Sequence, residues 1–531
     1  MKKLSYLLII AISAVSFTAC ELDLQESPNV LAPEGAEIDF LLNGMELNFA
    51  SFFHRSSDVT AEVMRMENLT GSTWENAFTG TSFDNIWIDA YADILVESEV
   101  LKTLAGESKL FHHRGIARFM EAYTLVTLVD LFGDVPYEEA LDPNNFAPNA
   151  SSGSDIYNGA LVLLDSALRD FAKTPLTPAS SDLIYGGDSD LWVTAVKTMQ
   201  LRINLQRRLV DNSAQAAIDA LITEGNLIDT DAEALTFQYG TNFQAPASQH
   251  PHYNANYAGG AVEYMSNSYM NLMNTDKTAP DPRMTYYFYR QDVDETTDVT
   301  ERNCINENKP AWYGPNDHFC QVGNGYWGRD HLDNSGIPPD GQARTTYGAY
   351  PAGGKYDNGE DVLVANGDGL GGAGIQAMHM PAATNFMLAE AVLELGTAGD
   401  AAALYEAGIR ASMTTVTGFV AGNATPVDID SYVTDAMSQY NAAANDAERL
   451  ELIVKEWYIA SWGNGIDMYN AYRRTTYPSG LQPGVRSSDD GAFYRSFIYP
   501  ASYVSRNANA DQKSDNKVQV FWDTNAPDIL D

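Results

Sequence analysis

Apolar residues recur at three- and four-residue spacing over several long segments, which is the pattern of amphipathic helices. The clearest segment is 112–132, where Gly133 and Pro136 end the pattern, because glycine favours the left-handed C-terminal cap and proline cannot continue a helix. The same spacing returns at 84–104, 156–171, 191–209, 382–395, 401–413 and 448–462. The sequence therefore predicts a mainly α protein whose helix pairs stack like a solenoid.

The segment from about residue 275 to about residue 375 has a different pattern. It is dense in Gly, Asn, Asp, Pro, Tyr and Trp and shows little helical period. That composition predicts turns, irregular loops and few short strands. The aromatic content argues against disorder, and long ordered loops are usually functional, so we expect this region to bind a ligand.

The N-terminus has the order of a lipoprotein export signal: Lys2 and Lys3, then an apolar stretch over 4–17, then Thr18, Ala19 and Cys20. We expect removal of residues 1–19 and lipidation of Cys20, which would anchor the chain to a membrane through acyl groups. A secretory signal followed by a coincidental cysteine is the alternative. The stretch is too short for a membrane span, and no later run approaches the roughly 20 apolar residues that a span needs.

The remaining chain, 20–531, is predicted to be a single domain, because no Pro-, Ser- or charge-rich linker divides it. It is strongly acidic: 32 basic and 71 acidic residues give a net charge of −39, and loss of Lys2 and Lys3 would make it −41. Nucleic acid is a poor binding partner for a protein with such a negative electrostatic field. A solvated surface explains this charge better than a device for binding cations.

Cys304 and Cys320 lie sixteen residues apart in the loop-rich region, and in an oxidising compartment they predict a disulfide that staples a loop. His318 and His331 are nearby but lack metal-ligand spacing. The acidic, glycine-bearing stretch 357–369 lacks the twelve-residue calcium loop, so a solvated turn is the better interpretation. We predict no metal and no cofactor.

Aromatic residues on both sides of the predicted disulfide suggest a sugar-binding surface. Sugars offer apolar faces and hydroxyl edges, so a glycan site needs exposed rings for stacking and polar groups for hydrogen bonds. The alternative is a small satellite core under a long loop. The candidate ligand-binding residues in this region are Trp312, Tyr313, Tyr326, Trp327 and Arg329.

Several segments, taken in order, resemble the SusD/RagB family of nutrient-binding outer-membrane lipoproteins. They are RFMEAY at 118–123, FGDVPY at 132–137, FMLAEA at 386–391, LYEAGIRASM at 404–413, EW at 456–457, YRRT at 472–475 with Pro478, and YP at 499–500. The part of the chain from about 245 to 374 carries no such motif. Ala501 to Tyr503 departs from the acidic residue that the family often has there.

The resemblance implies tetratricopeptide-like helix pairs in a right-handed stack. It also implies a cell-surface lid over a SusC-like TonB-dependent transporter, with an oligosaccharide, or in some relatives a peptide, bound between the two. Because family binding surfaces often draw on the early part of the chain, Trp74 joins the candidate residues. Trp87 falls at helical spacing with other apolar residues and is interpreted as core. Arg473 and Arg474 are interpreted as structural ties to carboxylates.

We predict that the protein is not an enzyme, because three common catalytic motifs are missing from the sequence. They are the Gly-x-Ser-x-Gly motif of serine hydrolases, the His-Glu-x-x-His motif of zinc proteases and the Gly-x-x-x-x-Gly-Lys phosphate-binding loop. A surface glycoside hydrolase remains the alternative, because two carboxylates suffice for that chemistry. A second alternative is an assembly scaffold that binds no small ligand.

Overall fold

The computed structural model describes residues 38–71, 73–275, 277–294, 296–300, 302–334, 343–420, 427–486 and 493–526. The predicted signal segment 1–19 and the predicted lipidation site Cys20 lie outside these residues. Within the described part of the chain, no helix combines the length and the apolar character of a membrane span.

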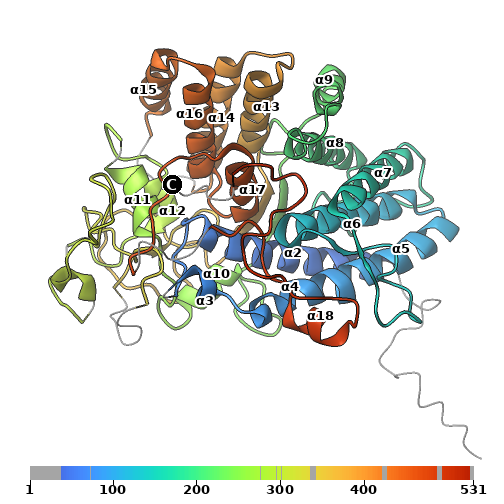
Figure 1. Cartoon of the computed structure of the whole chain (residues 1–531), viewed down its shortest axis with the longest axis horizontal. Helices are drawn as coiled ribbons and strands as arrows, with labels where there is room; N and C mark the ends of the chain where they lie inside the picture. Colours follow the sequence, from blue (N-terminus) through green and yellow to red (C-terminus); the bar gives the residue numbers. More distant parts are fainter. Residues whose placement is uncertain are drawn as a thin grey trace, which may run out of the picture.

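A long central helix, α2, organises the N-terminal half (Figure 1). It packs against α5, α6 and α17, while α6 packs on α7, α7 on α8, and α8 on α9. The bounds are α2 (Ile38–Val63), α3 (Trp74–Ala77), the 3-10 helix η2 (Gly80–Phe83), α4 (Asp84–Ile88), the π-helix η3 (Asp89–Leu95), α5 (Val96–Glu107), α6 (Phe111–Phe132), α7 (Gly153–Phe171), α8 (Ser189–Gln206) and α9 (Ala214–Glu224).

A second group of helices, α13 to α16, stands beside α8 and α9 in Figure 1. Here α13 packs on α14, α14 on α15, and both α13 and α14 on α16. The bounds are α13 (Pro381–Leu395), α14 (Ala401–Gly418), α15 (Ile429–Ala442), α16 (Asp446–Ala460), α17 (Gly465–Thr475) and α18 (Ala501–Arg506). Consecutive helices that pack on one another make the stack of helix pairs that the periodicity predicted.

The region between the two groups is poor in regular structure, as predicted. Its helices are short. The strands in the described part of the chain form three two-stranded antiparallel sheets: β1 with β2, which lies between α6 and α7 in the sequence, β3 with β6, and β4 with β5. The bounds are β1 (Val135–Pro136), β2 (Ala150–Ser151), β3 (Leu235–Gln238), α10 (Pro251–Tyr257), α11 (Asn267–Asn274), α12 (Met284–Tyr287), β4 (Phe288–Tyr289), η4 (Asn303–Asn306), β5 (Thr346–Tyr347) and β6 (Ile375–His379).

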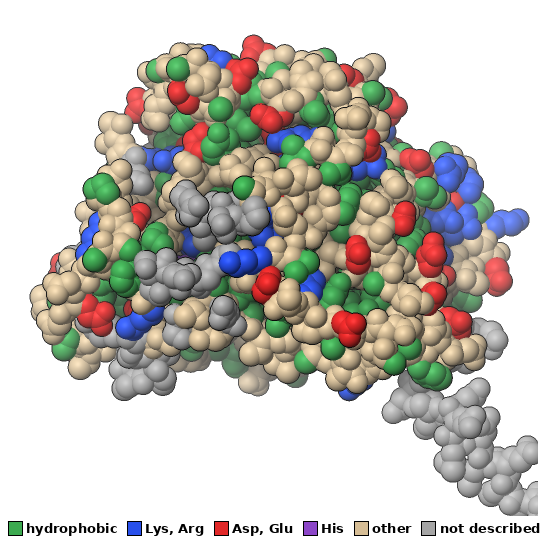
Figure 2. Space-filling view, in the orientation of Figure 1, with side chains coloured by type: hydrophobic (Ala, Val, Ile, Leu, Met, Phe, Trp, Pro, Cys, Tyr) green, Lys and Arg blue, Asp and Glu red, His purple; other side chains and the backbone are tan. Residues whose placement is uncertain are grey.

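One continuous cluster of buried apolar side chains extends from Leu42 on α2 to Trp522 near the C-terminus. It includes Trp457 and Trp462, both 1% exposed. Trp87 is 9% exposed and contacts Phe132, so its interpretation as a mainly buried residue holds. On the visible face, acidic side chains are scattered over helices and loops and form no single patch (Figure 2), which fits the solvated-surface interpretation.

Helices α6 and α7 approach so closely that Gly115 has no room for a side chain. A Cβ at this position would lie 2.8 Å from the ring of Phe171 on α7. We expect Gly115→Ala to lower the free energy of unfolding by about 1 to 2 kcal/mol, because overpacking outweighs the gain in helix propensity.

The matched control is Gly418→Ala at the end of α14, where a Cβ would meet nothing within 4 Å. It should leave stability unchanged or raise it by up to about 1 kcal/mol. Urea titration of both variants measures the difference. Equal midpoints would contradict the close approach of α6 and α7.

Candidate functional site

A disulfide joins Cys304 to Cys320, with the two Cα atoms 5.7 Å apart, as the sequence predicted. The loop that it closes is also cross-linked from within. The ammonium of Lys309 donates to the carbonyl oxygens of Gly314, at 2.8 Å, and of Asp317, at 2.6 Å. The backbone N–H of Gly314 donates to the carboxylate of Asp317 at 2.7 Å. These bonds cross-link the loop and restrain its conformation.

Trp312 lies on this loop and is the candidate aromatic whose face solvent can reach, with 40% of its surface exposed. Its indole N–H donates to the carbonyl oxygen of Gly484 at 3.1 Å, which fixes the ring against the segment before Arg486. Exposed Asn316 follows in the same loop, and exposed Arg486 pairs with Asp333 at 2.9 Å. A fixed, exposed ring among polar side chains has the chemistry of a sugar-stacking surface. We call Trp312, Asn316, Asp317 and Arg486 the Trp312 platform.

Under the loop lies a buried carboxyl group. Asp330 accepts the backbone N–H of Cys320 at 3.0 Å, and burial raises the pKa of Asp330 to about 7. Because the pKa is higher in the folded chain, ionisation of Asp330 opposes folding. Its contribution to stability therefore falls as the pH rises from about 4 towards 7.

Four predicted aromatic residues do not offer exposed faces, so the prediction of stacking surfaces at these positions is wrong for this structure. The exposed fractions are 0% for Trp74, 7% for Tyr313, 5% for Tyr326 and 2% for Trp327. A sugar ring stacks only on an aromatic face that solvent can reach, and here protein covers those faces. The alternative interpretation, a satellite core beneath the loop, fits them better.

Their neighbours show what covers them. The ring of Trp74 lies 4.7 Å from that of His331, and the guanidinium of Arg65 lies 4.9 Å from its centroid. Arg302 covers Trp327 at 5.1 Å, and Arg290 covers Tyr326 at 4.8 Å. The rings of Trp74, Trp327 and Tyr326 therefore make cation–π contacts with arginine side chains within the fold.

Arg329, the predicted polar ligand-binding residue, is also buried, with 6% exposed. Its guanidinium lies 4.5 Å from the ring of Tyr264, and Nη1 lies 3.4 Å from the carboxylate of Asp333. The prediction that Arg329 is accessible to a ligand is therefore wrong, because the guanidinium of Arg329 is paired with Asp333 inside the fold. Asp357 in the predicted solvated acidic turn is likewise buried, and it binds Arg290 at 2.6 Å.

A groove that the sequence did not indicate lies between α4 and α18 and has a volume of about 420 Å³. Trp87 forms its floor, with the rings of Tyr91 and Tyr503 each 4.6 Å away. Ile88 and Phe146 stand at its edge, 47% and 85% exposed. Because these residues come from three separate parts of the chain, no local pattern could have brought them together.

The stacked helix pairs define the class of this molecule: a mainly α protein built as a helical stack. The chain belongs to the SusD-like family, because the family model described as "Starch-binding associating with outer membrane" matches residues 31–309 and 346–500. This membership confirms the resemblance to SusD/RagB proteins, the association with the outer membrane and the prediction of a binding protein that is not an enzyme.

Solved structures show the same fold. A chitin-binding SusD homologue from Flavobacterium johnsoniae matches with a TM-score of 0.64 at 17% identity, covering 92% of this chain and 99% of that one. A SusD homologue from Bacteroides fragilis gives 0.65 at 18% identity, with 92% and 100% covered. A SusD/RagB family protein from Bacteroides thetaiotaomicron gives 0.67 at 16%, with 92% and 100% covered. A search of curated proteins finds no match.

Proposed function

We propose that the protein captures oligosaccharides at the cell surface and passes them unaltered to a SusC-like TonB-dependent transporter. The family model names starch, and a solved structure of the same fold is a chitin-binding protein, so a glycan is the favoured cargo. In this proposal, residues 1–19 are removed, a lipid on Cys20 holds the chain at the outer membrane, and residues 20–531 act as one domain.

The observation that carries the glycan proposal is the exposed and immobilised ring of Trp312. Stacking on a sugar face requires an aromatic side chain in a fixed orientation, and the Cys304–Cys320 loop and the bond to Gly484 supply it. Because the ring is ordered before ligand arrives, binding loses less conformational entropy. In this proposal, the polar groups of Asn316, Asp317 and Arg486 bind hydroxyl groups at the edge of a stacked sugar.

The test of cargo is calorimetry of the purified protein, lacking residues 1–20, against malto- and chito-oligosaccharides of increasing length and against mixed peptides. We expect saturable binding of at least one glycan series, with chromatography showing the sugar unchanged after prolonged incubation. Binding of peptides alone would replace the cargo but keep the delivery role. Release of shorter sugars would contradict the non-catalytic role.

Replacing Trp312 with Ala is expected to weaken glycan binding about 30-fold, because an aromatic anchor at a binding centre contributes about 2 kcal/mol and each 1.4 kcal/mol is a factor of ten. The matched control is Phe146→Ala, which removes an aromatic ring that is 85% exposed at the groove beside Trp87. It should bind glycan as the unmodified protein does. Loss of affinity in Phe146→Ala with none in Trp312→Ala would move the glycan site to that groove.

A further inference from the structure

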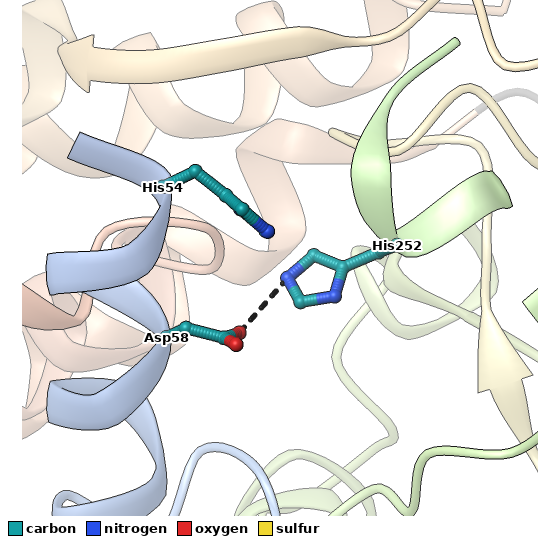
Figure 3. Close-up of side chains that lie close together, drawn as sticks. All are labelled: His54, Asp58 and His252. Carbon is teal, nitrogen blue, oxygen red and sulfur yellow. Dashed lines mark ion pairs between the residues drawn. The ribbon is translucent and has the colours of Figure 1, made fainter. Parts of the chain in front are cut away.

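Helix α2 presents a histidine and an aspartate one turn apart, and a second histidine faces them from α10. Figure 3 shows the side chains of His54, Asp58 and His252 pointing toward one another across the gap between the two helices. Nε2 of His252 lies 3.3 Å from Oδ1 of Asp58. One ligand atom from each of the three residues can be chosen so that all lie within 4.8 Å of one another.

The second imidazole sets this group apart from an ordinary ion pair. Asp58 alone would satisfy a protonated His252, yet the ring of His54 lies beside it, with ring centroids 4.8 Å apart in an edge-on arrangement. Two imidazoles next to a carboxylate form a ligand set that suits a divalent transition metal.

Neighbouring residues hold the imidazole of His252 in a defined orientation. Its Nδ1 lies 3.0 Å from the carboxylate of Glu263, and the amide of Asn256 donates to the same carboxylate oxygen at 2.5 Å. The backbone N–H of Glu263 donates back to Asn256 at 3.0 Å. Tyr347 stacks on the imidazole at 4.2 Å. In metal sites, a carboxylate that binds one nitrogen of a histidine directs the other nitrogen to the ion. Here that other nitrogen, Nε2, faces Asp58.

The surrounding charge favours a cation. Oε1 of Glu67 lies 3.8 Å from Nε2 of His252, and Glu62 follows Asp58 by one turn on α2. Arg55, the nearby arginine on α2, binds Asp89 at 3.0 Å.

The group lies near the surface, since 38% of the Asp58 side chain and 13% of the Glu67 side chain are exposed, but Oδ1 of Asp58, which faces His252, is itself buried. Tetrahedral ligand atoms at about 2.0 to 2.2 Å from one ion lie about 3.4 Å from one another. The three ligand atoms lie within 4.8 Å of one another, so side-chain rotation has to bring the widest pair closer by up to about 1.4 Å when the ion binds.

We propose that His54, Asp58 and His252 bind one divalent transition-metal ion, of which zinc is the representative, and that this ion ties α2 to α10. Two imidazoles and one carboxylate leave a fourth position for water or for Glu67. Calcium is a poor occupant, since it takes six to eight oxygen ligands. The ion has a structural role, and none of its three ligands belongs to the Trp312 platform, so the proposal does not depend on glycan binding.

The test is calorimetric titration of the chelator-treated protein with zinc chloride, with calcium chloride as a parallel arm. We expect one zinc ion per chain, no saturable calcium binding at this site, and a higher unfolding temperature with zinc. Asp58→Asn and His54→Ala should each weaken zinc binding at least tenfold. Glu263→Gln should weaken it about 10- to 100-fold, through loss of the outer partner of His252.

His112→Gln is the matched control. The ring nitrogen Nε2 of His112 lies 3.1 Å from the backbone carbonyl oxygen of Lys173, outside the proposed metal site. The His112→Gln variant should therefore bind zinc as the unmodified protein does. Melting curves without metal show whether each variant is folded, and Asp58→Asn changes charge with little change in shape. The proposal is overturned if zinc binds without a 1:1 ratio, or if Asp58→Asn and His112→Gln bind it equally well.

Discussion

Replacing Glu390 with Gln is expected to lower the free energy of unfolding by about 3 to 5 kcal/mol, because it leaves two buried arginines without their counter-charge. Glu390 on α13 is fully buried. Its two carboxylate oxygens accept from Arg474 on α17 at 2.6 and 2.7 Å, and one also accepts from Arg208, just after α8, at 3.1 Å. The three residues therefore connect α13, α17 and the turn after α8 in the interior, which confirms for Arg474 the predicted tie to a carboxylate.

Glu394→Gln is the control, one turn further along α13. Glu394 is 35% exposed on its side chain and reaches Arg208 at 3.3 Å, so its loss should cost less than about 1 kcal/mol. Urea titration compares the two variants. Equal loss of stability would show that the buried contact to Arg474 contributes nothing.

The same contact makes the protein sensitive to acid. Burial raises the pKa of Glu390, but Arg474 and Arg208 more than offset it, so the pKa lies below the ordinary 4.5. The stabilisation is therefore complete above about pH 4.5 and is lost as the pH falls through the lower value of the folded chain. The unmodified protein should lose more stability between pH 5 and 3 than Glu390→Gln does.

Removing the disulfide by the double replacement Cys304→Ser and Cys320→Ser is expected to cost about 3 kcal/mol of stability, as for a closed loop of about 15 residues. It should also weaken glycan binding several-fold, because the Trp312 platform then has to be ordered by the ligand itself. Calorimetry against the best glycan, with thermal unfolding in parallel, measures both effects.

Combining this change with Trp312→Ala separates the two roles. If the disulfide acts on binding by holding Trp312, its removal should have no further effect on glycan affinity once the ring is gone. Its effect on the unfolding temperature should remain. Additive losses of affinity would contradict that link.

The helices could be predicted because each carries its signal locally. The predicted segment 112–132 is α6, Phe111–Phe132, and 156–171 lies within α7, Gly153–Phe171. The segment 84–104 shows the right period but is divided into α4, the π-helix η3 and α5, because local hydrogen bonding changes without changing the apolar spacing. The long helix α2 has no comparably clear stripe, since its buried face includes Glu46, Ser56, Ser57 and Thr60.

The sequence by itself determined the helical architecture, the loop-rich middle region, the disulfide pairing and the family, because periodicity, composition and motif order are properties of neighbouring residues. Only the tertiary structure decided which aromatic rings face solvent. Trp312 and Tyr313 are adjacent in the chain, yet one is 40% exposed and the other 7%. Exposure depends on which distant residues pack on a side chain, and His54, Asp58 and His252 likewise meet only because α2 and α10, far apart in sequence, lie side by side in the fold.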